Sequence, residues 1–245
     1  MDDRAWMRRA LALAEGGRYT AAPNPLVGCV LVRGGQLVGQ GFHRRAGEGH
    51  AEVLALAEAG PRAAGATAYV TLEPCAHHGR TPPCAQALIG AGVARVVAAM
   101  ADPNPRVAGQ GLAQLRAAGV AVDCGVLADQ AAALNPGFLK RMASGRPYVR
   151  VKMAQSLDGR SALADGASRW ITGPAARADV QRWRARSQAI VTGVGTVLAD
   201  DPQLTVRDVP DAPQPLRVVL DSRLRTPPTA RLLREPGATL HPQRR

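Results

Sequence analysis

Residues 50–52 (HAE) and 72–84 (LEPCAHHGRTPPC) decide how the first half of this 245-residue chain is read. Together they supply the imidazole of His50, two thiols and, two residues after the imidazole, the carboxylate of Glu52. Zinc takes nitrogen and sulfur ligands, and a catalytic zinc keeps one of its four positions for water. Glu52 would then lie beside the open position as the group that moves protons. We therefore predict a zinc ion with three protein ligands, His50, Cys75 and Cys84.

The spacing of the two cysteines departs from the usual pattern of zinc-dependent nucleobase deaminases. Those enzymes carry His-x-Glu followed by Pro-Cys-x-x-Cys, with the glutamate as general acid/base. Here eight residues, not two, separate Cys75 from Cys84. The longer gap predicts a loop that carries polar and cationic groups to a substrate while Cys84 still closes the metal site. The alternative is a pair of buried structural thiols, which would need neither the upstream HAE segment nor a polar loop.

Alternating strand and helix patterns predict an α/β layer fold with helices covering a sheet. Apolar periodicity and glycine or proline breaks predict helices at 2–16, 50–59, 84–90, 109–118, 128–146 and 174–186. Short apolar runs predict strands at 26–33, 37–43, 67–72, 93–100, 120–126, 147–154, 188–192 and 216–221. The three predicted ligands then fall at or just before helix starts, where partial positive charge favours thiolate.

The composition changes near residue 145, where Ser144-Gly145-Arg146-Pro147 follows an alanine-rich run. We predict two domains, 1–145 with the zinc site and 146–245 with a second α/β unit. In the second domain a predicted strand runs into Gly193-Val194-Gly195-Thr196. Glycine lets backbone N–H groups approach an anion, so this segment is either a phosphate-binding turn or a plain tight turn.

Composition limits the class of partner. The net charge is +12, but 29 of the 31 basic residues are scattered arginines, and eight aromatic residues offer few stacking platforms for bases. We therefore expect no nucleic-acid partner, while phosphorylated small molecules remain compatible with the charge. Cys29 and Cys124 lie in apolar runs and are predicted to be buried free thiols, as in a reducing compartment. Without a signal-peptide pattern or a long apolar run, we expect a cytoplasmic protein with no membrane contact.

Several motifs together resemble the bacterial bifunctional deaminase-reductase of riboflavin biosynthesis. They are Asn24-Pro25-x-Val27-Gly28, the two segments quoted above, and Asp102-Pro103-Asn104-Pro105. Residues 148–222 resemble the reductase half of that family through VKMAQSLDGR, SRWITG, VTGVGTVLADDPQLTVR and RVVLDS. The resemblance implies a cytidine-deaminase-like three-layer α/β/α domain followed by a partial dihydrofolate-reductase-like α/β domain.

The resemblance also implies a reaction and its residues. The family deaminates a diaminopyrimidinone that carries a ribosylamino 5′-phosphate, and then reduces the ribosyl chain with NADPH. By motif, Glu52 is the catalytic proton shuttle. The positions that match the pyrimidine and phosphate pocket are Asn24, His43, His77, Arg80 and Asn104. On the reductase side, the NADPH positions are Ala154, Trp170, Thr196, Asp200 and Ser222. The substrate positions there are Ser168, Arg184, Leu204 and Arg207.

The end of the sequence departs from the family pattern. The family's reductase half extends well beyond the length present here, and residues 234–245 do not resemble it. We therefore expect a truncated or frameshifted reductase domain with doubtful activity. Two other functions stay open: a deaminase that acts on a nucleic-acid base, and a non-enzymatic zinc-stabilised binding module. Three ligands argue against the module, because structural zinc sites are closed by four. The sequence leaves a homo-oligomer open.

Overall fold

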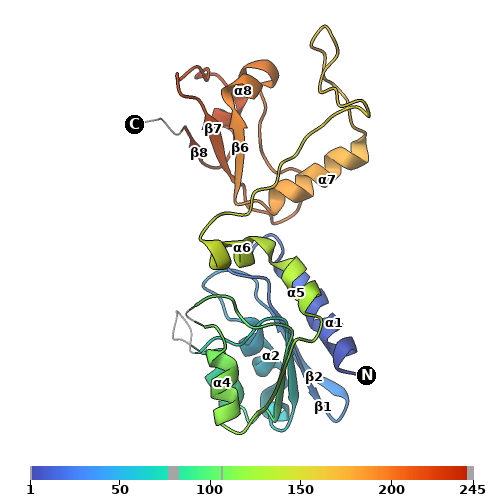
Figure 1. Ribbon diagram of the computed structural model, residues 1–245, viewed down its shortest axis with the longest axis vertical. Helices are drawn as coiled ribbons and strands as arrows, with labels where there is room; N and C mark the ends of the chain where they lie inside the picture. The colour runs from blue at the N-terminus through green and yellow to red at the C-terminus, as the bar shows by residue number, and fades with distance from the viewer. Residues whose placement is uncertain (1, 77–82, 106, 242–245) are drawn as a thin grey trace. The chain divides into compact units, whose positions relative to one another are not determined.

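The computed structural model describes residues 2–76, 83–105 and 107–241. The chain divides into two compact units, Met1–Val149 and Arg150–Arg245, and each is described by itself. Figure 1 shows the helices and strands of both units and labels many of them.

The first unit is built on a five-stranded mixed sheet with the order β2-β1-β3-β4-β5. Its strands are β1 (Gly28–Arg33), β2 (Gln36–Phe42), β3 (Thr67–Val70), β4 (Arg95–Ala98) and β5 (Ala121–Cys124). β1 pairs antiparallel with both β2 and β3, whereas β3, β4 and β5 run parallel. The predicted hairpin turn between β1 and β2 is present, with both glycines, Gly34 and Gly35, at positive φ.

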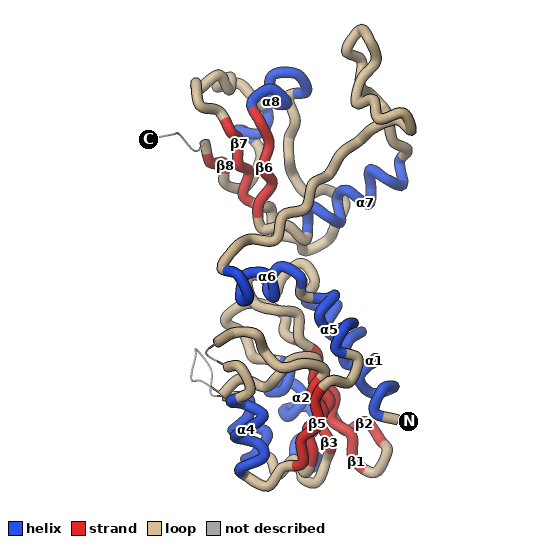
Figure 2. The backbone as a smooth tube through the Cα atoms, viewed as in Figure 1, coloured by secondary structure: helices blue, strands red, loops and turns tan. Residues whose placement is uncertain are grey.

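Helices cover both faces of this sheet and give the predicted three layers. They are α1 (Asp3–Ala14), α2 (Ala51–Ala59), α3 (Cys84–Gly90), α4 (Gln110–Ala117) and α5 (Ala128–Leu134). A further helix, α6 (Pro136–Ser144), follows α5 and has no buried residue. One core lies between the sheet and α2, α3 and α4, and a second lies between the opposite face and α1 and α5. Figure 2 shows the strands enclosed between these helices.

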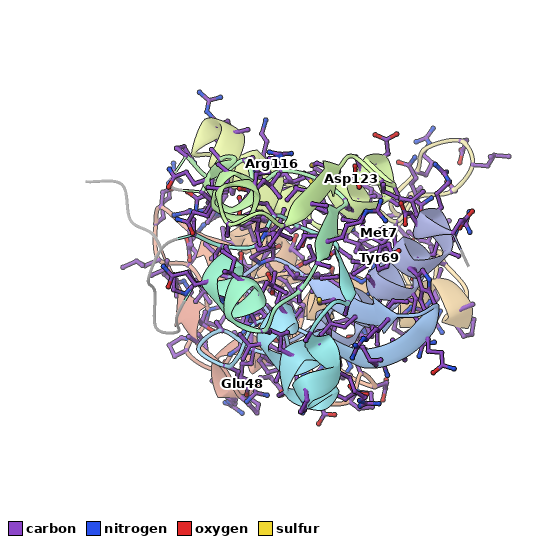
Figure 3. The ribbon with its side chains drawn as sticks, turned by 90° about the horizontal axis from the view of Figure 1, so that it is seen from below. Met7, Glu48, Tyr69, Arg116 and Asp123 are labelled. Carbon is purple, nitrogen blue, oxygen red and sulfur yellow. The ribbon has the colours of Figure 1, made fainter. Side chains whose placement is uncertain are left out.

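Small side chains let the helices lie close to the sheet. A Cβ atom added to Gly28 would lie 2.0 Å from the carbonyl oxygen of Ala10 in α1. One added to Gly39 would lie 2.2 Å from the carbonyl oxygen of Ala55 in α2. On the α1 face, Met7 is fully buried and lies beside Tyr69 of β3 (Figure 3). A chain with 3% aromatic residues thus fills its cores by close backbone approach.

Several predicted boundaries need correction. The run 128–146 is not one helix, because Asn135 ends α5 and Pro136 occupies the first turn of α6, where its missing N–H costs nothing. The predicted strand at 147–154 is wrong: these residues form neither helix nor strand, and the side chains of Val149, Val151 and Met153 are 70% to 77% exposed. A strand needs a neighbour that accepts its hydrogen bonds, and the described residues provide none here.

The two cysteines outside the predicted metal site differ from each other. Cys29 is buried in β1, between two neighbouring strands, as predicted. Cys124 is exposed, which contradicts the prediction of a buried thiol. It lies in β5 at the edge of the sheet, where three of the four residues are exposed.

The second unit contains a smaller, parallel sheet with the order β6-β7-β8. Its elements are α7 (Pro174–Ala185), β6 (Ala189–Gly193), α8 (Val194–Asp200), β7 (Leu216–Leu220), α9 (Arg231–Arg234) and β8 (Thr239–Leu240). A small core lies on one side of the sheet, around Val194, Val197, Val219, Ala230 and Leu232. Other apolar side chains of the sheet, including Val191 and Leu220, are more than half exposed.

Neither unit contains a helix with the length and apolar content that crossing a lipid bilayer requires, as far as the described residues go.

Candidate active site

Three donor atoms converge at the end of the first sheet. His50 is the N-cap residue of α2, Cys84 is the first residue of α3, and Cys75 follows β3 after a short loop. The Nδ1 atom of His50 lies 3.2 Å from Sγ of Cys84 and 3.6 Å from Sγ of Cys75. The three donor atoms all lie within 4.8 Å of one another. The predicted helix starts at His50 and Cys84 are confirmed, but the prediction is wrong for Cys75, which lies in a loop and not at or just before a helix start. Three separate segments therefore bring the three side chains together.

This donor set fits a zinc ion. Tetrahedral zinc with Zn–N near 2.0 Å and Zn–S near 2.3 Å places neighbouring nitrogen and sulfur ligands roughly 3.5 Å apart. The two nitrogen–sulfur distances given above agree with that separation. One imidazole and two thiols are also the ligand types that zinc prefers, and three ligands leave a fourth position for water.

The two thiols differ in acidity. The pKa of Cys75 is lowered to about 4, first by its hydrogen bond with Cys84 and then by His50, against the opposing effect of burial. The backbone N–H of Cys84, at the start of α3, also donates to Sγ of Cys75 at 3.3 Å. The hydrogen bond between the two cysteine side chains, together with burial, raises the pKa of Cys84. The pKa is thus lowered at Cys75 and raised at Cys84, and binding of a metal by both sulfur atoms would release the remaining thiol proton.

Glu52 lies on the first turn of α2, two residues after His50, and only 3% of it is exposed. Burial raises the pKa of its carboxyl to about 7, against the lowering effects of a backbone hydrogen bond and of His50. A carboxyl group with a pKa near neutrality can both accept and return a proton.

A cavity of about 530 Å³ opens beside these residues. Of the deaminase-side residues predicted from the sequence, it is lined by Asn24, His43, His50, Glu52, Cys75 and Asn104. Cys84 is fully buried and is not among the lining residues. His77 and Arg80 lie outside the described residues.

The sequence predicted no site role for further residues that line this cavity, among them Glu48, Glu73, Asp102 and Phe138. Asp102 belongs to the quoted Asp-Pro-Asn-Pro motif, which could have indicated it, whereas no local pattern marks Phe138.

A hydrogen-bonded chain orients one wall of the cavity. Nδ1 of the His43 ring lies 3.2 Å from the carbonyl oxygen of Gly49, and Nε2 lies 3.0 Å from Nδ2 of Asn24. If Nδ1–H donates to the carbonyl, Nε2 accepts from the Asn24 amide, and both contacts are satisfied by one neutral tautomer. Burial lowers the pKa of His43, which favours that neutral ring. Elsewhere in the cavity lining, the backbone N–H of Asn104 donates to Oδ1 of Asp102 at 2.8 Å.

In the second unit, three of the predicted substrate-side residues lie near one segment, 203–207. Arg184 of α7 donates to the carbonyl oxygen of Thr205 at 3.0 Å, and burial and the nearby Arg207 lower its pKa. Arg207 donates to the side chain of Gln203 at 2.7 Å, and Leu204 is buried. Two guanidinium groups at one place form a site suited to an anion.

The remaining predicted residues of the second unit lie on separate segments. Ala154, Ser168 and Trp170 lie in coil, and Trp170 is 72% exposed beneath the guanidinium of Arg177. The GVGT segment is a strand-to-helix junction, because β6 ends at Gly193 and α8 begins at Val194. Thr196 and Asp200 lie on α8, and Ser222 follows β7. Neither the cavity of about 530 Å³ nor a second one, whose lining includes Phe42 and Leu54, is lined by any of these residues.

Two family models match this chain, one in each unit. Residues 1–100 match the cytidine and deoxycytidylate deaminase zinc-binding region. Residues 147–241 match the RibD C-terminal domain. The first match contains all three predicted zinc ligands, His50, Cys75 and Cys84, and the second contains the whole 203–207 segment.

Close relatives match both units together. The riboflavin biosynthesis protein RibD of Escherichia coli (strain K12) is 57% identical over 251 residues, which cover 98% of this chain and 68% of the relative. The RibD protein of Haemophilus influenzae is also 57% identical, and this chain covers 65% of its length. The chain thus spans about two thirds of the length of these relatives.

Solved structures agree with the sequence relatives. The structure of Acinetobacter baumannii RibD, form 1, has a TM-score of 0.94 and 55% identity, covering 99% of this chain and 70% of that one. A Thermotoga maritima structure described as a diaminohydroxyphosphoribosylaminopyrimidine deaminase and reductase has a TM-score of 0.92 at 38% identity, covering 98% and 69%. With this coverage and identity across both units, the chain belongs to the RibD family of riboflavin biosynthesis proteins.

Proposed function

We propose that this protein catalyses the zinc-dependent hydrolytic deamination of a diaminopyrimidinone that carries a ribosylamino 5′-phosphate, within riboflavin biosynthesis. The observation that supports this most directly is one cavity that combines a His-Cys-Cys donor set with a buried carboxyl, Glu52. The description of the Thermotoga relative names the same substrate class for that protein. We assign the deaminase to a domain at 1–145 and a reductase to 146–245.

In this proposal the chain's own residues hold the substrate and move protons. Zinc held by His50, Cys75 and Cys84 would supply an acidified water when bound. Glu52 would accept a proton from the attacking water, pass it to the ring nitrogen and then assist the departure of ammonia. General acid/base catalysis of this kind contributes about 10²–10⁴ in rate. In the metal-free site burial raises the pKa of Glu52, and a buried carboxyl at this position is suited to accepting a proton from water and passing it on.

Recognition of the pyrimidine would use the polar atoms of the cavity walls. Asn24, fixed by the neutral His43 ring, would offer its amide to the ring edge, and Asn104 would act from the opposite wall. We infer from the family motif that His77 and Arg80 complete this pocket, with Arg80 as the cation for the 5′-phosphate. The substrate is then a small phosphorylated molecule. We expect no nucleic-acid or membrane partner, and a cytoplasmic location fits a chain with four free thiols.

We propose a second activity, NADPH-dependent reduction of the ribosyl chain, for the 146–245 domain. Its support is the match to the RibD C-terminal domain and the Arg184–Arg207 pair, which suits an anionic substrate group. Ser168 and Leu204 would join that pair on the substrate side. NADPH would be held by Ala154, Trp170, Thr196, Asp200 and Ser222.

The test is incubation of the zinc-loaded chain with the diaminopyrimidinone phosphate, with and without NADPH, followed by mass spectrometry of the products. We expect ammonia and the deaminated ribosylamino product without NADPH. Formation of the ribityl product with NADPH would support the second activity, and its absence would refute that activity for this chain. A shift of labelled transfer RNA at physiological salt, with no turnover of the small molecule, would favour a nucleic-acid substrate instead.

Glu52→Gln is the first prediction. The amide keeps the shape of the side chain but cannot shuttle a proton, so zinc stays at one per chain while ammonia release falls at least about 10²-fold. Glu58→Gln, an exposed glutamate on the same helix, is the matched control and should remain active. Full ammonia release by Glu52→Gln would remove Glu52 from the mechanism.

A further inference from the structure

Glu73 is a buried carboxylate that the proposed mechanism does not use. It lies between β3 and Cys75, is 4% exposed and lines the cavity. Its Oε2 accepts the backbone N–H groups of Asp102 at 3.0 Å and Gly109 at 2.9 Å. Its Oε1 accepts those of Gly111 at 2.9 Å and Leu112 at 3.3 Å. One side chain thus satisfies four backbone donors of a segment 29 to 39 residues further along the chain.

That segment, residues 102–112, forms a wall of the cavity and begins helix α4. It contributes Asp102, Asn104 and Val107 to the lining. Asp102 in turn accepts the N–H of Asn104 at 2.8 Å. α4 has no capping hydrogen bond from its own N-cap side chain, because that residue is Gly109 at φ 84°. Glu73 supplies the missing acceptors from another part of the fold.

Backbone contacts join the same two segments. The N–H of Glu73 donates to the carbonyl oxygen of Met100 at 3.0 Å. A Cβ atom on Gly111 would lie 1.8 Å from the carbonyl oxygen of Pro74. The residues just before Cys75 are therefore packed directly on the wall that carries Asn104. Among the described residues, no ion pair involves Glu73, so these N–H groups are its principal partners.

We propose that Glu73 is a positioning residue for substrate binding: it fixes the 102–112 wall, and with it Asn104, relative to the end of β3 from which Cys75 projects. Glu73 does not take part in the proton transfers. The inference rests on the proposed deaminase function for the identity of the substrate. A carboxylate is required because each of its oxygens accepts two N–H groups, whereas an amide offers one oxygen and turns a donor toward the other two.

The test is Glu73→Gln in the full zinc-loaded chain, compared with Glu58→Gln. Glu58 also accepts a backbone N–H, that of Gln40 at 3.1 Å, but on the exposed surface. We expect Glu73→Gln to raise KM about tenfold, as lost hydrogen bonds would. Zinc should stay at one per chain and kcat should stay within about threefold, the pattern of lost ground-state binding. Affinity for the deaminated product, measured by calorimetry, should fall by the same factor.

Hydrogen exchange separates positioning from general stability. In Glu73→Gln the amides of 102–112 should lose protection, while those of β1 and β2 keep theirs. Asn104→Ala should raise KM similarly, and adding Glu73→Gln to it should give little further effect, since both act through one wall. If Glu73→Gln fails to fold, Gly109→Ala perturbs one of the same hydrogen bonds from its donor side and should raise KM with zinc retained.

Two outcomes would overturn the inference. One is unchanged KM and product affinity in Glu73→Gln while the wild-type chain is active. The other is a fall of kcat and zinc content in parallel, which would place Glu73 in support of the metal ligands instead. A wild-type chain that releases no ammonia would instead refute the proposed function. The exchange of the 102–112 amides would then still decide whether Glu73 fixes that wall.

Discussion

At the scale of single residues, the acidity of the cysteine pair governs the metal centre. The pKa of Cys75 is lowered and the pKa of Cys84 is raised, in both cases chiefly through the hydrogen bond between the two side chains. His50 contacts both sulfur atoms through Nδ1. Each of the three side chains therefore already faces the other two, and little rearrangement would be needed for them to share an ion.

The second prediction concerns these thiols. Cys75→Ser and Cys84→Ser should each lower bound zinc well below one per chain, because a hydroxyl is a poor ligand for zinc compared with a thiolate. Zinc is measured by a metal assay after dialysis of the purified chain. Cys124→Ser, which changes an exposed thiol on β5, is the control and should keep its zinc. One zinc per chain in both site variants would refute the ligand set.

At the scale of elements, glycine sets how closely helices approach the first sheet. A methyl group on Gly28 would overlap the backbone of α1 at Ala10, since its Cβ would lie 2.0 Å from the carbonyl oxygen. The third prediction is that Gly28→Ala lowers the free energy of unfolding by about 2 kcal/mol or more, as overpacking does. Thermal unfolding measures this. Gly90→Ala, with no atom within 4 Å of the added Cβ, is the control. Equal unfolding midpoints for both variants would contradict the close approach.

Charged groups also attach α1 to the sheet. Arg95 of β4 donates to both oxygens of Asp3, at 3.0 and 2.7 Å, and to Asp123 of β5, while the hydroxyl of Tyr69 donates to Asp3 at 2.8 Å. The hydrogen bond from Arg95 lowers the pKa of Asp3, against the opposing effect of burial and with help from Tyr69. A carboxyl group whose pKa is lowered by folding stabilises the folded state at every pH above its ordinary pKa. This stabilisation is lost as the pH falls through the pKa that the group has in the folded state.

The fourth prediction follows from that sign. Asp3→Asn should unfold at a lower temperature than wild type at pH 7, because the asparagine cannot pair with Arg95. The difference should narrow as the pH falls below the ordinary value of 3.8, since wild-type Asp3 then becomes protonated. Thermal unfolding between pH 7 and acid pH measures it. Asp129→Asn is the control: Asp129 is an exposed aspartate on α5, so its replacement should change the unfolding temperature less. If the difference in unfolding temperature between Asp3→Asn and wild type grew at acid pH, the stabilising role of the Asp3–Arg95 pair would be contradicted.

The elements also show what the sequence could and could not predict. The starts of α2 at His50 and of α3 at Cys84 were predictable, because capping and apolar spacing are local signals. The strand order β2-β1-β3-β4-β5 was not predicted, since pairing joins residues far apart in the chain. Glu73 was missed for the same reason: its partners lie at least 29 residues away. Segment 147–154 alternates like a strand, but alternation cannot supply a neighbouring strand.

At the scale of the whole molecule, the two units differ in the hydrophobic cores that stabilise them. The first has two cores around one sheet. In the second, the described residues form a small core of five buried side chains and leave apolar side chains of the sheet exposed. Residues 146–173 form neither helix nor strand, and most of their side chains are exposed. Backbone of this kind opens with little loss of buried contacts.

The fifth prediction is that a limited amount of trypsin cleaves first within 146–173. Four exposed basic residues there can be cut: Arg150, Lys152, Arg160 and Arg169. In the first unit, Arg95 lies in β4 and is held by ion pairs with Asp3 and Asp123, so cleavage there should wait until that unit opens. Mass spectrometry of the early products should find a persistent fragment that ends near residue 150 and retains zinc. A urea-unfolded sample, cut throughout, is the control. Early cuts between 28 and 124 would instead show that the first unit opens as readily as the segment that follows it.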